Sequence, residues 1–358
     1  MKKIFLFVML ISVAIILNGC VFNISGEKID TSEAIFGATV FSKEEEIKIT
    51  LNGQDTLFIP GEMEDITIKP WDKDFIHIKA YKKIKTNNRT RAEHYVDQIK
   101  IFSEKTEKQI QVYVDFGDEL KILAQRYALL EISVPKSIEK FDVSSPSGTI
   151  DISDIKDAEE VEINGETGKI SAHNIYVKKY SIGMGVGDVT AAHITGDGEI
   201  SSTTGKMDIS EINGDLKIIT ESGKCNIYKY EGSLNANIDK GLIRAEDIAL
   251  REESSLKATT GDIEAELKDI DKESNTHFSS TSGRINIKIP QNAKFDVDAK
   301  ATSGNVRINF SLNGQKLSFV SFLRNIFSSK TAVGKINGGG GKISAHTEKG
   351  IITIKKSP

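Results

Sequence analysis

The stretch TGKMDIS at residues 204–210 returns eighteen residues later as SGKCNIY at residues 222–228. In each copy a glycine is followed, two and four residues on, by apolar side chains: Met207 and Ile209, then Cys225 and Ile227. Alternation of apolar and polar residues with a period of two is typical of a half-buried β-strand. The two copies therefore predict two short strands that follow turn glycines and share one register.

The same pattern extends outward in both directions along the chain. Its glycines lie 18 to 22 residues apart, and a second, weaker alternating segment stands between most successive copies. Each period therefore contains two short strands and two turns, and the turn glycines supply backbone conformations that side chains disfavour. Such regular spacing indicates an internal repeat. The repeat glycines are Gly148, Gly168, Gly187, Gly205, Gly223, Gly241, Gly261, Gly283 and Gly304.

A repeat of this length cannot bury its own apolar face, whereas stacked repeats can. We therefore predict an all-β fold, a parallel β-solenoid of 18–22 residues per coil, in which each strand pairs with its equivalent about 4.8 Å away. The regular solenoid is expected over residues 148–358, and further β coils over residues 56–147. The glycine pattern recurs at Gly341 and Gly350, where we expect it to close the stack.

Two segments depart from the β period. Near residues 87–100 apolar side chains recur at helical spacing in a charged stretch, which predicts an inserted surface helix. Near residues 316–330 apolar residues at helical spacing stand among basic ones, which predicts a second helix. We expect this helix to cap or flank the C-terminal coils, because an open stack of parallel strands exposes an edge and a core end. Contact with a membrane surface is the alternative.

A longer repeat joins some of these elements. ISVP at residues 132–135 leads to KFDV at 140–143, and IKIP at residues 287–290 leads to KFDV at 294–297. With the Ser/Thr-Gly-x-Ile-x-Ile/Ala units and the glycine run 338–341, this element resembles the bacterial "putative adhesin" family, an export-associated domain of unknown function. The resemblance covers residues 56–358. It implies a β-solenoid and carries over no established activity and no catalytic residues.

The first twenty residues are of a different kind. Two lysines precede an apolar run from Ile4 to Leu17, which is too short to span a bilayer comfortably and is typical of a signal peptide. The sequence LNGC that ends at Cys20 resembles the bacterial lipobox. We therefore expect residues 1–19 to be a lipoprotein signal peptide and Cys20 to be the lipidation site. The alternative is an ordinary secretory peptide or a short N-terminal anchor, with Cys20 an incidental thiol.

Lipidation at Cys20 would determine where the protein works. Residues 20–55 would hold the lipidated N-terminus, a polar tether and a first strand. The body would be exported and anchored to a membrane of the bacterial cell envelope by its N-terminal lipid.

Composition excludes several classes of function. Lys and Arg total 47 against 51 Asp and Glu, a net charge of -4, so the chain lacks the basic field that nucleic-acid binding usually needs. Two cysteines exclude a disulfide-rich scaffold and a Cys-based zinc site. No cofactor and no nucleic-acid partner are predicted. The expected partners are the membrane, through Cys20, and an envelope polymer or protein.

Residues three positions after each repeat glycine should point outward and lie above one another in successive coils. A glycan-cleaving solenoid would need a pair of carboxylates on one face. Acidic, basic and neutral residues are interleaved instead, so we expect a structural, solvated face with no catalytic residue and no metal site. In chain order this outward row is Asp151, Ser171, Thr190, Asp208, Asn226, Arg244, Glu264, Asn286 and Arg307.

Cysteine and histidine are the other candidate site residues. Cys225 should be a buried hydrophobe with a raised thiol pKa, because its register neighbours are Met207 and Ile243. Histidines at 173, 193 and 346 stand near the ends of strands, where imidazoles of adjacent coils could approach one another. No third metal ligand recurs with them, so exposed turn histidines are the preferred interpretation.

These observations favour a lipid-anchored, non-catalytic binding or scaffold protein of the envelope, whose long faces contact a polymer or a protein. An accessory component of an envelope signalling or stress-response system is the alternative. A glycan-cleaving solenoid enzyme is the third hypothesis.

Overall fold

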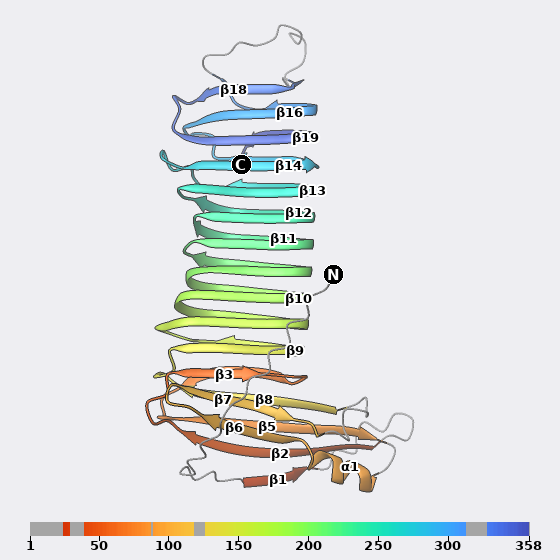
Figure 1. Cartoon of the computed structure of the whole chain (residues 1–358). Helices are drawn as coiled ribbons and strands as arrows, with labels where there is room; N and C mark the ends of the chain where they lie inside the picture. Colours follow the sequence, from red (N-terminus) through yellow and green to blue (C-terminus); the bar gives the residue numbers. More distant parts are fainter. Residues whose placement is uncertain (1–23, 29–38, 87–88, 118–125, 313–327, 358) are drawn as a thin grey trace, which may run out of the picture.

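The computed structural model describes residues 24–28, 39–86, 89–117, 126–312 and 328–357. Figure 1 shows these residues as one elongated stack of strands, with the helix α1 (Arg89–Val96) near its N-terminal end. Apolar side chains at alternate strand positions form one core that follows the stack. The predicted all-β solenoid is confirmed.

In the regular part of the stack, strands pair in parallel, one coil on the next. Gly205 pairs with Gly223, Met207 with Cys225, and Cys225 with Ile243, so equivalent residues of successive repeats are direct neighbours. The three apolar side chains are buried and form one column of the core. The strands here are β9 (Lys140–Ser153), β10 (Ala158–Asn213), β11 (Leu216–Gly232), β12 (Leu234–Leu250), β13 (Glu253–Leu267), β14 (Asn275–Ser282) and β15 (Ile285–Ile289).

The C-terminal strand does not lie at the end of the stack. β19 (Gly341–Lys356) pairs in parallel with β14 and β15 on one side and with β16 (Phe295–Ile308) on the other. Figure 1 shows it between the strands of these two coils. The expectation that Gly341 and Gly350 close the stack is therefore wrong, because their coil is an interior one.

At both copies of the longer sequence repeat, a strand from another part of the chain lies between two strands that follow one another in sequence. After β15 the chain turns at Pro290 and resumes in β16, with β19 between the two strands. After β8 (Arg126–Pro135) it resumes in β9, with β4 (Asp65–Trp71) paired to both. Proline has no N–H for a strand ladder, so it suits the end of a strand at which the chain leaves its neighbour.

The N-terminal end of the stack is largely antiparallel. β2 (Thr39–Thr50) pairs in this way with β1 (Ile24–Lys28) and with β5 (Phe75–Thr86), and β5 pairs with β8. The described part of the segment 20–55 thus forms two strands, where the sequence predicts a first strand. The remaining strands here are β3 (Thr56–Pro60), β6 (Lys100–Lys105) and β7 (Gln109–Asp115). β3 runs parallel to both β7 and β9, while β6 and β7 form an antiparallel pair.

The helix expected near residues 87–100 is confirmed as α1, which contacts β2 and β5. Its outer residues Thr90, Arg91, Glu93 and His94 are exposed, whereas Val96 at its end is buried. Val96 and the partly buried Tyr95 pack against the core, so apolar contacts at the C-terminal turn hold this mostly polar helix on the strands.

The C-terminal end is covered by short antiparallel strands. β17 (Ser328–Ser329) and β18 (Thr331–Ile336) both pair with the outer side of β16. The helix expected near residues 316–330 falls mainly outside the described residues. Its last part is described, and Ser328 and Ser329 there belong to β17.

Glycines line two corners of the coil. At the first corner Gly223 has a φ of 143°, and a Cβ there would overlap the carbonyl oxygen of Gly205 in the coil below. A side chain is therefore excluded both by backbone conformation and by the close approach of the next coil. A second glycine ladder, which the sequence reading missed, consists of Gly196, Gly214 and Gly232.

A third corner is left-handed without glycine. Its residues have φ between 52° and 63°, a region that costs most L-residues free energy and that Asn and Asp tolerate best. Side chains of neighbouring coils meet there: His193 Nδ1 is 2.9 Å from Glu211 Oε2, and Lys229 Nζ is 3.4 Å from Glu211 Oε1. The corner residues are Asp154, Asn174, His193, Glu211, Lys229 and Asp247.

We expect Lys229→Val to destabilise the protein by about 1–2 kcal/mol relative to Lys229→Asn, measured as a shift in the urea midpoint. Both variants lose the pair with Glu211, and this exposed pair contributes little. A β-branched residue is strained at positive φ, whereas asparagine is not. Equal midpoints for the two variants would show that this corner is not held in the left-handed conformation.

Candidate functional site

The outward row exists, and its side chains join neighbouring coils. Asn226 Nδ2 donates to Asp208 Oδ1 at 2.7 Å, and Arg244 donates to Glu264 Oε2 through Nε at 2.9 Å and lies 2.7 Å from it through Nη2. The order of the row needs one correction. Thr353 of β19 lies between Asn286 and Arg307, because the C-terminal coil is inserted at that level.

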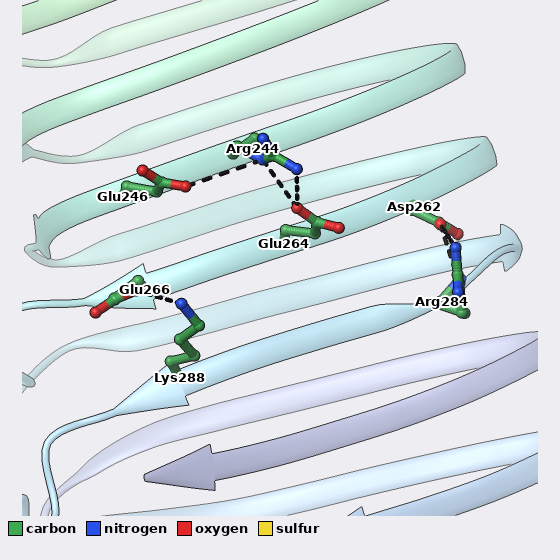
Figure 2. A network of polar contacts seen from close by, with 7 residues as sticks. All are labelled: Arg244, Glu246, Asp262, Glu264, Glu266, Arg284 and Lys288. Atoms are coloured by element: carbon green, nitrogen blue, oxygen red, sulfur yellow. Dashed lines mark hydrogen bonds and ion pairs between the residues drawn. The ribbon is translucent and has the colours of Figure 1, made fainter. Parts of the chain in front are cut away.

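Further ion pairs run beside this row, as Figure 2 shows. Arg284 Nη2 lies 2.7 Å from Asp262 Oδ2, and Lys288 Nζ lies 2.7 Å from Glu266 Oε2. Burial raises the pKa of Asp262, but the hydrogen bonds and charge of Arg284 outweigh it, so this pKa is lowered. A carboxylate held ionised in this way is unsuited to act as a general acid at neutral pH.

Arg251 ties together three coils, and the sequence reading missed it. Its Nη1 lies 2.8 Å from Asp269 Oδ1 and its Nη2 lies 3.0 Å from Glu231 Oε1. The hydrogen bond to Asp269 is the largest cause that raises the pKa of Arg251. Arg251 stands at a corner outside the glycine register, so the repeat pattern offered no signal for this network.

Two carboxylates do lie side by side on an outer face. Asp142 of β9 pairs in register with Glu162 of β10. Burial first, and then the charges of Glu162 and Glu160, raise the pKa of Asp142. Asn164 Nδ2 donates to Glu162 Oε1 at 2.9 Å. This pair is one candidate for a carboxylate dyad on the outer face.

Two charged residues of the N-terminal part are buried, and neither was predicted. Lys82 is 5% exposed, and its Nζ donates to Glu45 Oε2 at 2.7 Å and to the carbonyl oxygen of Ile99 at 2.8 Å. Glu64 has no exposed surface; its Oε2 accepts from the backbone N–H groups of Glu62 and Met63. Burial raises the pKa of Glu64. Both groups are closed to substrate, so their role is structural.

Cys225 is buried as expected, and burial raises the pKa of its thiol to about 12. A thiol that stays protonated and enclosed is inert. His173 and His193 are partly exposed beside Asp151 and Glu211. Within the described part of the chain, no group of three or more His, Cys, Asp or Glu side chains is arranged to hold a metal ion.

A lateral recess of about 610 Å³ lies where the first strand of a coil meets the Pro290 crossover. Tyr228 and Glu246 contribute to its wall from adjacent coils, and Gln291 and Asn292 contribute from the crossover turn. Tyr228 is 46% exposed. The sequence gives no signal for this recess, because its shape depends on the positions of the corners in neighbouring coils.

Cys20 lies outside the described residues, so its lipidation stays a prediction. No helix in the described ranges is long and apolar enough to cross a membrane.

Comparisons with known proteins place the chain in a family. The Toastrack DUF4097 family, a domain of unknown function, matches residues 54–275 and 269–355. No curated protein matches the chain. Two solved structures are similar: a "putative cell adhesion protein" from Clostridium sporogenes ATCC 15579, and a "Putative lipid binding protein" from Parabacteroides distasonis ATCC 8503.

The first of these is 12% identical with a TM-score of 0.21, and covers 88% of this chain and 100% of its own. The second is 14% identical with a TM-score of 0.27, and covers 88% of this chain and 97% of its own. Because TM-scores this low show no common superposition, the assignment rests on the sequence match. The coiled parallel strands, the glycine corners and that match over most of the chain lead to one conclusion: this protein belongs to the Toastrack DUF4097 family.

Proposed function

We propose that this protein is a lipid-anchored, non-catalytic binding or scaffold module of the bacterial cell envelope. The observation that carries this proposal is the pairing of charges along its outward faces. Asp208, Asp262 and Glu264 each have a cationic or amide partner, which supports a contact surface over a reaction centre. A long stack of coils presents such a surface continuously to a polymer or a protein.

The anchor in this proposal comes from the sequence of residues 1–20. A short apolar run that ends in LNGC supports cleavage before Cys20 and attachment of acyl chains to it. An accessory role in envelope signalling would use the same anchor and the same faces, with a membrane protein as partner. A glycan-cleaving activity would need a pair of carboxylates such as Asp142 and Glu162, and Glu162 is already engaged by Asn164.

We expect the full chain, expressed in a bacterium that lipidates proteins, to enter the detergent phase on Triton X-114 partitioning. Cys20→Ser should move it to the aqueous phase, because several acyl chains are lost. Cys225→Ala is the matched control, since it removes the other cysteine, which is buried in the core, and should leave partitioning unchanged. Detergent partitioning of Cys20→Ser would contradict the anchor. Cross-linking in intact cells would then separate a polymer or scaffold partner from a signalling protein.

A further inference from the structure

The recess beside Pro290 owes its shape to two irregularities of the stack. The pairing of β12 with β13 slips between Ala245 and Ile248, so the left-handed corner at Asp247 is displaced from the coil above. One coil further, the crossover turn after Pro290 passes β19, and Asn337 Nδ2 donates to the carbonyl oxygens of Gln291 and Ala293 in this turn. The hollow between these two features has a volume of about 610 Å³, within the usual range for ligand sites.

Its lining combines a flat ring with many hydrogen-bonding groups. Tyr228 supplies an aromatic surface that is 46% exposed, and Glu246 lies beside it, as its register neighbour on the next coil. Glu266 continues the wall, while Gln291 and Asn292 bring two exposed amides from the turn. An apolar ring face bordered by amides and carboxylates matches the apolar faces and hydroxyl groups of a sugar.

The charges around the recess are largely balanced. Lys288 Nζ lies 2.7 Å from Glu266, and Arg244 Nε lies 3.9 Å from Glu246. Lys229 Nζ lies 5.3 Å from the centroid of the Tyr228 ring. The pKa of Lys229 is raised, first by its hydrogen bond to Glu211 and to a smaller extent by the charge of Asp247. Glu246 and Glu266 therefore each have a basic group within 4 Å, and Lys268 lies in the lining beside Asp247. This favours a neutral, hydroxyl-rich ligand over a basic peptide.

We propose that this recess is a binding site for a neutral glycan chain, with one sugar ring against Tyr228 and its hydroxyls bonded to Glu246, Gln291 and Asn292. The proposal rests on the function proposed above and names the polymer and the place at which the solenoid holds it. The open side of the recess lets the chain continue along the neighbouring coils.

The test measures binding of purified full-length protein to two probes: isolated peptidoglycan sacculi, and a hexamer of β-1,4-linked N-acetylglucosamine. We expect both to bind, and Tyr228→Ala to weaken the hexamer at least tenfold. Glu246→Gln keeps an acceptor oxygen and should change affinity less than threefold. Tyr176→Ala is the matched control, because Tyr176 is 50% exposed on another coil and should leave binding unchanged. Melting temperatures of all variants report that each is folded.

Each outcome decides between specific statements. If Tyr228→Ala and Tyr176→Ala lose the same affinity for the hexamer, or if Tyr228→Ala loses none, the recess is not the binding site, although glycan binding itself is still supported. No binding of the wild-type protein to either probe would also overturn it, but would leave an anchored scaffold with a protein partner, which the partitioning and cross-linking experiments address. Binding of hexalysine in place of the sugar hexamer would identify a basic peptide as the ligand and overturn the glycan proposal.

Discussion

Ile352→Asp in β19 is expected to open the whole C-terminal part of the stack, although it lies six residues from the end of the chain. Ile352 is fully buried and stands between Ile285 of β15 and Val306 of β16. An unpaired carboxylate there costs several kcal/mol, a large part of the stability of a typical domain. Because β19 joins the two coils, its loss would separate β16 and the strands that cover it.

Limited proteolysis measures this effect directly. In Ile352→Asp we expect new cleavage between residues 290 and 340, well before the substituted strand. Lys355→Gln, at an exposed position of β19, should leave the cleavage pattern and the melting temperature unchanged. Cleavage confined to residues after 340 would mean that β19 is a terminal coil that frays alone, which would contradict its insertion.

Gly223→Ala is expected to cost about 3–5 kcal/mol in the free energy of unfolding. The new Cβ would overlap the carbonyl oxygen of Gly205, and a φ of 143° is strained for any side chain. The neighbouring glycines repeat this approach from coil to coil, so the strand cannot shift without disturbing the coils on both sides. Urea unfolding of the purified protein gives the change in free energy.

Gly165→Ala is the control for this substitution. A Cβ at Gly165 would approach the flexible end of Met184, with Cε at 2.9 Å, and would make an ordinary contact with Ile170 Cδ1 at 3.6 Å; the backbone there is not left-handed. It should cost far less than Gly223→Ala. Equal losses would show that the corner glycines are tolerated as ordinary small residues and that the coils do not approach as closely as the structure places them.

Much of the fold could be predicted because the relevant information is local. The alternation around Met207 and Cys225 fixes which side chains face the core, and the spacing of the glycines fixes the length of a coil. The candidate site was harder to predict from the sequence. The repeat register predicts that Asp208, Asn226, Arg244 and Glu264 lie in one outward row, which the strand pairing confirms. It gives no signal for Arg251 or for the recess beside Tyr228, because both depend on corners of unequal length.

The sequence by itself determined the period, the register and the burial of each repeat, because a strand's alternation and a corner's need for glycine are properties of a few adjacent residues. The order in which the coils stack was decided only by the tertiary structure. Coils with the same apolar pattern can pair with one another almost equally well, so nothing local distinguishes β16 from β19 as the neighbour of β15. After Pro135 and after Pro290 the chain leaves a space of one strand in the stack, and long-range pairing places β4 in the first space and β19 in the second. The crossover at Pro290 also forms part of the recess.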